Sequence, residues 1–234
     1  MELIYQGKTK DVFVLGNKDY LLKYKDDATG KDGAFDPGEN SVGLSIEGLG
    51  YANLKLSQYL FKELIKNGVP THFIKADLDE KSMTVKPARL FGKGLEFICR
   101  LRAYGSYLKR YSGYVKESQP LDYFIEVTLK DDEKGDPVIS KPSLIMLQVM
   151  TKEEYRQCKK LTRKCTKIIK ACLNRLGLEL YDIKFEFGIV DGKVAVIDEL
   201  SGGNMRVFKD GKSVMPIELS EIVTNEGKVT DKAK

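Results

Sequence analysis

Two strand-like segments joined by Asp191-Gly192 constrain the fold of this chain most. The segments YDIKFEFGIV (181–190) and KVAVID (193–198) place charged residues between apolar ones, around a dipeptide typical of a two-residue hairpin turn. With that turn, Glu186 would lie on one face of the hairpin, and Asp198 would lie among phenylalanines on the other. Carboxylates are costly to bury, so several of them in a hairpin that looks buried must be paired or bound to a ligand.

A shifted register would bring two of these carboxylates together. A bulge at Gly188, or a three-residue loop, moves the pairing by one residue and sets Glu186 across from Asp198. Facing carboxylates repel unless a cation lies between them, and Mg²⁺ with nucleotide phosphates is the usual cation for such a pair. The alternative is a solvated strand of alternating charges, but KFEFG and VAVID are too apolar for that. The sequence therefore predicts a Mg²⁺ site at Glu186 and Asp198.

The composition is that of a globular protein that binds anions. The chain has 234 residues, of which 42% are hydrophobic, and a net charge of +5. It contains no apolar run of about 18 residues and no export signal at its start, so we expect a cytoplasmic protein with no membrane partner. Basic and acidic residues alternate along the chain without a basic, aromatic platform, so no nucleic-acid partner is expected. Two copies could pair as a homodimer.

The cysteines fit a core rather than a metal site or a disulfide framework. Cys158, Cys165 and Cys172 recur every seven residues within a helical pattern, so they are expected to share one buried helix face. Only one histidine, His72, is available to a zinc site. Small apolar core residues are therefore the preferred interpretation.

Residues 1–85 are predicted to form an amino-terminal lobe that is mostly antiparallel β-structure. Alternating apolar residues indicate three strands in the first 25 residues. The stretch 26–50 is rich in Gly, Asp and Ser, and is expected to be a long irregular loop that closes over a ligand. Apolar spacing predicts an amphipathic helix over 51–66, ended by Asn67-Gly68.

Residues 86–234 are predicted to form a carboxyl-terminal α+β lobe. A strand near residues 95–102 leads into a basic turn. A long helix begins at Thr151, where Glu154 completes a capping box, and ends before Gly177. The polar residues 224–234 are expected to be frayed.

Two glycine-containing turns carry cations that suit phosphate groups. In YQGKTKDVF, Gly7 would let the backbone approach a polyphosphate while Lys8 and Lys10 offer point charges, although a solvated hairpin tip is an equally simple reading. In CRLRAYGSYLKR, guanidinium groups and a hydroxyl surround a glycine, unless they form only a basic helix face. The candidates in that second turn are Arg100, Ser106, Lys109 and Arg110.

Taken in order, GKTKDVF, RAYGSYLKR, YDIKFEFG and VIDELS…R resemble the motif series of the SAICAR synthetases, the phosphoribosylaminoimidazole-succinocarboxamide synthases of purine biosynthesis. The resemblance covers nearly the whole chain, from Tyr5 to about Phe208. It implies an α+β fold of two lobes, akin to protein kinases and ATP-grasp enzymes. It also implies an ATP-dependent ligase that joins the carboxylate of carboxyaminoimidazole ribotide (CAIR) to the amine of L-aspartate, with Mg²⁺.

The resemblance also implies a role for each candidate residue. Gly7, Lys8, Lys10 and Lys86 would bind ATP. Arg100, Ser106, Lys109, Arg110 and Arg206 would bind the ribotide, chiefly its phosphate. Glu186 and Asp198 would bind the metal ion. Asp182, Lys184 and Arg206 would act in the reaction itself.

Three departures from the family pattern leave other functions open. Ser201 is followed by Gly202-Gly203 rather than Pro-Asp, Phe208 stands near a usual Trp, and Leu49-Gly50 replaces Lys-Gly. A relative that joins another carboxylate to another amine therefore stays an alternative. A kinase-like phosphotransferase is a second alternative, although this chain lacks the H-R-D type loop that carries the catalytic Asp of kinases. A nucleotide-binding or RNA-binding module without catalysis is the third.

Overall fold

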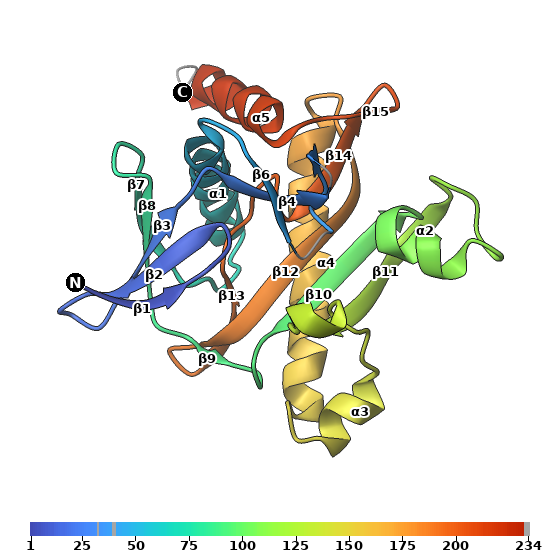
Figure 1. Ribbon diagram of the computed structural model, residues 1–234, viewed down its shortest axis with the longest axis horizontal. Helices are drawn as coiled ribbons and strands as arrows, with labels where there is room; N and C mark the ends of the chain where they lie inside the picture. The colour runs from blue at the N-terminus through green and yellow to red at the C-terminus, as the bar shows by residue number, and fades with distance from the viewer. Residues whose placement is uncertain (32, 39–40, 232–234) are drawn as a thin grey trace.

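The computed structural model describes residues 1–31, 33–38 and 41–231, which form three antiparallel sheets flanked by helices (Figure 1). This confirms the α+β class. The first sheet has five strands in the order β1-β2-β3-β8-β7, all drawn from the first 85 residues. Its strands are β1 (Glu2–Gln6), β2 (Lys10–Val14), β3 (Tyr20–Tyr24), β7 (Phe73–Asp77) and β8 (Ser82–Val85).

The second sheet has seven strands and is centred on one long strand, β12 (Glu179–Val190), which pairs with four others. The order β11-β10-β12-β14-β15 forms its main path, and β13 and β9 also pair with β12. The other strands are β9 (Arg89–Leu90), β10 (Leu95–Arg102), β11 (Pro120–Leu129), β13 (Lys193–Ile197), β14 (Met205–Lys209) and β15 (Lys212–Ser213).

The stretch 26–50 is more ordered than expected. It forms a small third sheet in the order β5-β4-β6, from β4 (Asp27–Lys31), β5 (Ala34–Phe35) and β6 (Val42–Ser45). The expectation of an irregular loop was wrong because the glycines of this stretch allow two backbones to approach. A Cβ on Gly43 would lie 2.5 Å from the carbonyl of Gly30. Residues 32, 39 and 40 lie outside the described part of the chain.

The two long helices match their predicted boundaries. Helix α1 (Leu49–Lys66) ends at Asn67 and Gly68, the latter with a left-handed φ of 65°. Helix α4 (Lys152–Asn174) begins with the predicted capping box between Thr151 and Glu154. Its three cysteines are buried free thiols on the face that packs against the seven-stranded sheet, as expected.

The carboxyl end is helical further than its polar sequence indicated. Helix α5 runs from Pro216 to Asp231 and lies beside α1, so the expectation of a frayed stretch from residue 224 was wrong up to residue 231 (Figure 1). Ser220 anchors the helix by donating to the carbonyl of Ala52 at 2.7 Å. The short helices are α2 (Gly105–Tyr111) and α3 (Lys141–Met146), with a 3₁₀ turn at Asp132–Lys134.

One hydrophobic core spans the two larger sheets. It runs from Leu22 and Met83 in the first sheet, through Leu60 in α1, to Phe97 and Phe185 in the second. A boundary between two lobes near residue 86 agrees with the division of the sheets, but whether each lobe folds as its own domain stays a prediction. Within the described ranges, no helix combines the length and apolar character needed to cross a lipid bilayer.

Candidate functional site

The charged residues of strand β12 are explained by the different neighbours of its two faces. Ile183, Phe185 and Phe187 point to one face and are at most 2% exposed, in the core beneath α4. The alternate residues Asp182 and Glu186, with Lys184 between them, therefore share the opposite face.

That opposite face carries charged residues on three strands, with Ile98 of β10 opposite Lys184 among them. Glu96 lies opposite Glu186 and Arg100 lies opposite Asp182 in the pairing of β10 with β12. Strand β11 adds Glu126, beside Arg100. Polar residues on one face of a sheet and apolar residues on the other explain the alternation without a solvated strand.

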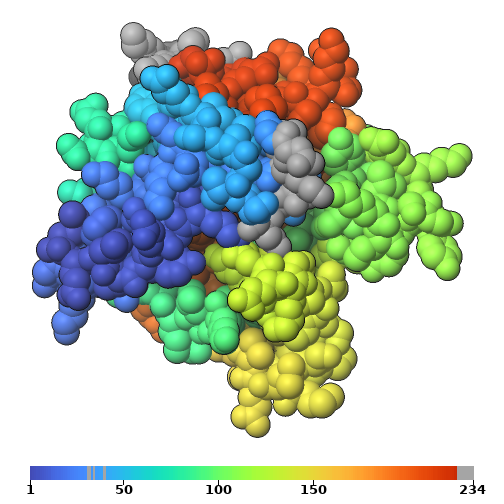
Figure 2. Space-filling view, in the orientation of Figure 1, coloured from blue at the N-terminus to red at the C-terminus, as the bar shows by residue number. Residues whose placement is uncertain are grey.

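A cavity opens above this polar face, between the amino-terminal turn and the seven-stranded sheet. Figure 2 shows the hollow at the centre of one face of the molecule, bordered by the blue amino-terminal residues and the yellow-green segment near residue 130. We call it the nucleotide cavity, after the ATP-binding role that the sequence resemblance implies for Gly7, Lys8 and Lys10. Its lining includes Gly7, Lys8, Lys10, Lys130, Glu186, Asp198 and Glu199.

The predicted carboxylate pair lies in this cavity, but not by the predicted route. The register of β12 with β13 is regular, with Glu186 opposite Ile197 and Gly188 opposite Ala195, so the bulge or three-residue loop was wrong. Strand β13 ends at Ile197, and Asp198 then adopts a left-handed φ of 63°. This turn places the Asp198 side chain on the cavity that Glu186 lines, rather than among the phenylalanines.

Gly188 serves a different purpose from the one expected. A Cβ at this position would lie 3.0 Å from Cβ of Ala88 and 3.1 Å from the carbonyl oxygen of Arg89. The glycine therefore lets strand β9 pair closely with β12, where Leu90 lies opposite Gly188.

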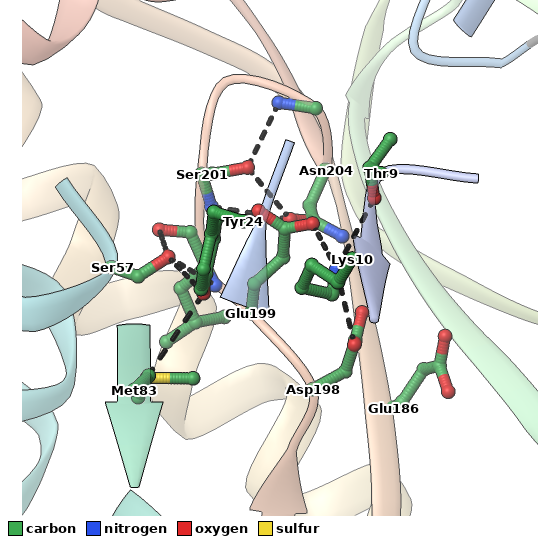
Figure 3. Close-up of polar contacts among 12 residues, drawn as sticks. Thr9, Lys10, Tyr24, Ser57, Met83, Glu186, Asp198, Glu199, Ser201 and Asn204 are labelled. Carbon is green, nitrogen blue, oxygen red and sulfur yellow. Dashed lines mark hydrogen bonds and ion pairs between the residues drawn. The ribbon is translucent and has the colours of Figure 1, made fainter. Parts of the chain in front are cut away.

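Two lysines balance the carboxylates of the nucleotide cavity. Lys10 contacts Glu199 and lies 3.3 Å from a carboxylate oxygen of Asp198, as Figure 3 shows. Lys130, directly after β11, approaches Glu186 to 2.6 Å. Glu199 keeps one buried carboxylate oxygen, Oε2, without a hydrogen-bond partner. Three of the carboxylates that line this cavity, Glu186, Asp198 and Glu199, are thus paired with lysines, and one buried oxygen of Glu199 remains without a partner.

The same charges pull the pKa values of the carboxylate pair apart. Burial raises the pKa of Glu186, the charge of Asp198 adds to this rise, and Lys130 opposes both. Burial would also raise the pKa of Asp198, but Lys10 and Lys130 outweigh burial and hold that pKa below its ordinary value. Two buried carboxylates repel one another when both are ionised, so this pair is suited to share a divalent cation.

The amino-terminal turn faces these carboxylates from the other side of the cavity. The amide of Gly7 donates to the carbonyl of Lys10 at 2.8 Å, and a Cβ on Gly7 would lie 2.7 Å from that oxygen. The glycine is therefore required by the tight turn. Lys8 spans the cavity mouth to Asp132 at 2.6 Å. Lys86 is not part of this group, because its ammonium pairs with Asp191 at the exposed hairpin tip and lines neither cavity.

A second cavity adjoins the first over the same sheet face, and we call it the anion cavity. Arg206 enters it with two partners, Asp182 at 3.0 Å and Asp36 at 2.7 Å. A Cβ on Gly105 would lie 2.8 Å from this guanidinium, so the glycine lets helix α2 begin against it. The lining of the anion cavity includes Arg100, Ser106, Arg110, Asp182, Lys184 and Arg206.

Arg100 supports the anion cavity from below rather than projecting into it. Its side chain is 2% exposed, and its three nitrogens donate to Glu126, Asp182 and Ser106 at 2.6, 3.2 and 2.9 Å. Arg110 also binds Glu126, at 2.6 Å, but its side chain is 34% exposed. Of the three guanidinium groups in this cavity, Arg110 and Arg206 are therefore the more accessible, and Arg100 fixes the carboxylates that orient them.

Lys184 joins the two cavities. Its ammonium lies 2.7 Å from Glu96, and both residues line both cavities. Burial lowers the pKa of Lys184, but the charges of Glu96 and Glu186 together outweigh burial and raise that pKa above its ordinary value. A cation is thus held at the boundary where a ligand of one cavity meets a ligand of the other. Lys109 lies on α2, lines neither cavity, and acts on Asp36 through its charge.

Several residues in or beside the two cavities were missed from sequence. Lys130 and Glu126 lie in or just after strand β11, and Asp36 lies in the segment expected to be irregular. A lysine directly after an apolar strand was the available signal for Lys130. No local pattern distinguishes Asp36 from other carboxylates of the chain.

The three departures from the family pattern have structural reasons. A Cβ on Gly202 would lie 2.5 Å from Pro216, so this position must be glycine beside helix α5. Leu49, which stands where the family has a lysine, is 1% exposed, and the shared Gly50 donates its amide to Asp26 at 2.8 Å. Phe208 stacks on Tyr181 with ring centroids 3.8 Å apart. Leu49 and Gly203 line the nucleotide cavity, whereas Gly202 and Phe208 line neither cavity.

Comparison with known proteins supports one family throughout. The family model described as SAICAR synthetase matches residues 3–219. A phosphoribosylaminoimidazole-succinocarboxamide synthase of Clostridium tetani is 52% identical over 225 residues, which cover 95% of this chain and 99% of the relative.

Solved structures agree with the sequence relatives. A crystal structure of phosphoribosylaminoimidazole-succinocarboxamide synthase from Ehrlichia chaffeensis has a TM-score of 0.81 at 27% identity, covering 98% of this chain and 94% of that one. A SAICAR synthetase in complex with ADP has a TM-score of 0.80 at 26% identity, covering 97% of this chain and 92% of that one.

Proposed function

The chain belongs to the SAICAR synthetase family, and on that premise we propose that its two adjoining cavities bind ATP and CAIR for ligation to L-aspartate. The protein is an ATP-dependent carbon–nitrogen ligase of purine biosynthesis. The proposal concerns which residues bind each substrate and how they promote the reaction.

The nucleotide cavity binds ATP through its phosphates. The Gly7 turn brings backbone close to them, and Lys8, Lys10 and Lys130 supply positive charge. The related SAICAR synthetase that was solved with ADP supports nucleotide use. Lys130 enters this assignment from the structure, through its contact with Glu186.

Glu186 and Asp198 fit a Mg²⁺ ion. Their donor atoms are hard carboxylate oxygens, and both line the nucleotide cavity, with the unpartnered Oε2 of Glu199 in the same lining. When bound, Mg²⁺ would neutralise charge on the phosphates of the nucleotide. Lys10 pairs with Asp198 and Lys130 pairs with Glu186, and these ion pairs hold the two carboxylates in place for that role.

The anion cavity binds the ribotide. Arg110 and Arg206 offer guanidinium forks to its phosphate, with the Ser106 hydroxyl beside them. Asp182 and Arg100 orient these groups by fixed hydrogen bonds. Arg206 is paired with Asp36 in this structure, so a bound phosphate would take the place of that carboxylate.

The reaction proceeds by transfer of a phosphoryl group and then of an acyl group. A carboxylate oxygen of CAIR attacks the γ-phosphorus of ATP, which forms an acyl phosphate and releases ADP. The amine of aspartate attacks the acyl carbon, forms the amide and releases phosphate. Both steps need charge neutralisation and positioning more than a protein nucleophile. Lys184, at the boundary of the cavities, is placed to neutralise the reacting carboxylate.

The observation that carries this assignment is the shared lining. Lys184 and Glu96 border both cavities, so a nucleotide phosphate in one and a carboxylate in the other can meet. A coupled assay of ADP release tests the assignment. Release should require CAIR and L-aspartate together. Release that needs a hydroxyl acceptor instead would indicate a phosphotransferase, and no release with any of these substrates would indicate a binding module.

The proposal also places the protein in a compartment of the cell. Its four cysteines are buried free thiols, which suits the reducing cytoplasm, where we place it. The homodimer stays a prediction.

A further inference from the structure

The single histidine of the chain contacts the segment that carries a proposed metal ligand. His72 precedes β7 in the first sheet and is 4% exposed. Its Nε2 lies 3.0 Å from the backbone carbonyl oxygen of Asp198. A carbonyl can only accept a hydrogen bond, so Nε2 carries the hydrogen and donates.

This contact acts where the backbone of β13 leaves the sheet. Val196 exchanges two strand-like hydrogen bonds with the segment before β7, through Pro70 and His72. The ladder ends there, and Asp198 turns to a φ of 63°, a conformation that costs a non-glycine residue free energy unless its surroundings hold it. The carbonyl of Asp198 therefore needs a donor from outside the ladder.

The next residues are held from the same side of the molecule. Ser57 of α1 accepts the amide of Leu200 at 3.2 Å and donates to its carbonyl at 3.1 Å, as the close-up in Figure 3 also draws. The His72 ring also packs against Phe61 of α1, with ring centroids 5.6 Å apart. Side chains from the amino-terminal half thus position the turn that carries Asp198 and Glu199.

We propose that His72 is a positioning residue for the metal site: its Nε2–H holds the left-handed turn at Asp198, so that this carboxylate faces Glu186 and the nucleotide. The inference rests on the proposed function, because it presumes that Asp198 binds Mg²⁺. Outer groups that orient metal ligands change metal affinity about 10- to 100-fold when they are removed.

The test compares variants of the full chain by the Mg²⁺ concentration that half-saturates ADP binding, measured by calorimetry. His72→Phe keeps a ring but removes the donor, and should raise this concentration about tenfold. His72→Gln keeps a donor and should stay within about twofold of the unmodified protein. His72→Met matches Gln in length without its donor, so the Gln and Met variants decide the question if the Phe variant does not fold.

Phe61→Leu provides the matched control. It removes packing from the same pocket and leaves the hydrogen bond in place, so it should lower the melting temperature without moving the Mg²⁺ dependence. Unchanged Mg²⁺ dependence in His72→Phe and His72→Met would overturn the inference. So would an equal shift in Phe61→Leu. Magnesium-independent ADP binding in the unmodified protein would instead contradict the proposed metal site.

Discussion

Replacing Glu186 with Gln is expected to lower the turnover of SAICAR formation about a thousandfold, because a bound metal ion contributes several kcal/mol to stabilising transferred phosphoryl groups and each 1.36 kcal/mol is tenfold. Glutamine keeps the shape of the side chain and a carbonyl for Lys130, which now lies 2.6 Å away. Steady-state kinetics at saturating substrates, with circular dichroism to confirm folding, would measure the effect.

Glu179→Gln is the matched control for this substitution. Glu179 begins the same strand, but it pairs with Arg102 at the surface and its side chain is 46% exposed. Its replacement should leave turnover unchanged, because exposed ion pairs contribute little. A Glu186→Gln variant that retains turnover within tenfold of the unmodified protein would remove Glu186 from the metal site.

Replacing Arg100 with Met is expected to reduce the free energy of unfolding by about 3–5 kcal/mol, the range for breaking a buried ion pair from one side. The guanidinium is 2% exposed and satisfies Glu126, Asp182 and Ser106 at once. Its loss leaves two carboxylates buried with fewer partners. Urea unfolding followed by circular dichroism would measure the change.

Arg102→Met, two residues further along the same strand, separates this effect from a general loss of charge. Arg102 pairs with Glu179 in a half-exposed position, where its side chain is 31% exposed. Its replacement should cost no more than about 1 kcal/mol. Equal losses in the two variants would show that the buried network around Arg100 adds nothing to stability. Weaker binding of CAIR in Arg100→Met is expected as a second consequence, through Asp182 and Arg206.

The features that sequence predicted well are set by nearby residues. Helix α4 follows from its apolar spacing and from a capping box completed within four residues, Thr151 to Glu154. The polar and apolar faces of β12 follow from strict alternation. These patterns need no knowledge of the rest of the chain.

The features that sequence predicted wrongly depend on tertiary contacts. The hairpin argument placed Glu186 and Asp198 near one another but chose a register shift, because a regular strand would have put Asp198 on the other face. The structure instead turns a single residue to positive φ, and the carbonyl of that residue accepts a hydrogen bond from His72, which lies just before β7 and 126 positions earlier in the chain. No local pattern in IDEL indicates such a contact.

The ion pairs in and beside the two cavities also could not be predicted from local sequence. Lys130 reaches Glu186 from a strand about 56 positions earlier, and Asp36 reaches Arg206 from 170 positions away. The polar stretch that carries Asp36 looked irregular because its small sheet rests on glycine contacts rather than on alternating apolar residues. Such pairings become visible only when the strands are in place.

Glu186 and Asp198 are proposed to hold a metal ion on nucleotide phosphates beside the anion cavity. A crystal structure grown with ADP and Mn²⁺, a substitute for Mg²⁺ with a measurable anomalous signal, tests it most directly. We predict an anomalous peak within bonding distance of both carboxylates and of a phosphate oxygen, with the ammonium of Lys10 displaced from Asp198. A peak bound by phosphates alone, or by other side chains while Lys10 keeps its contact with Asp198, would contradict the account.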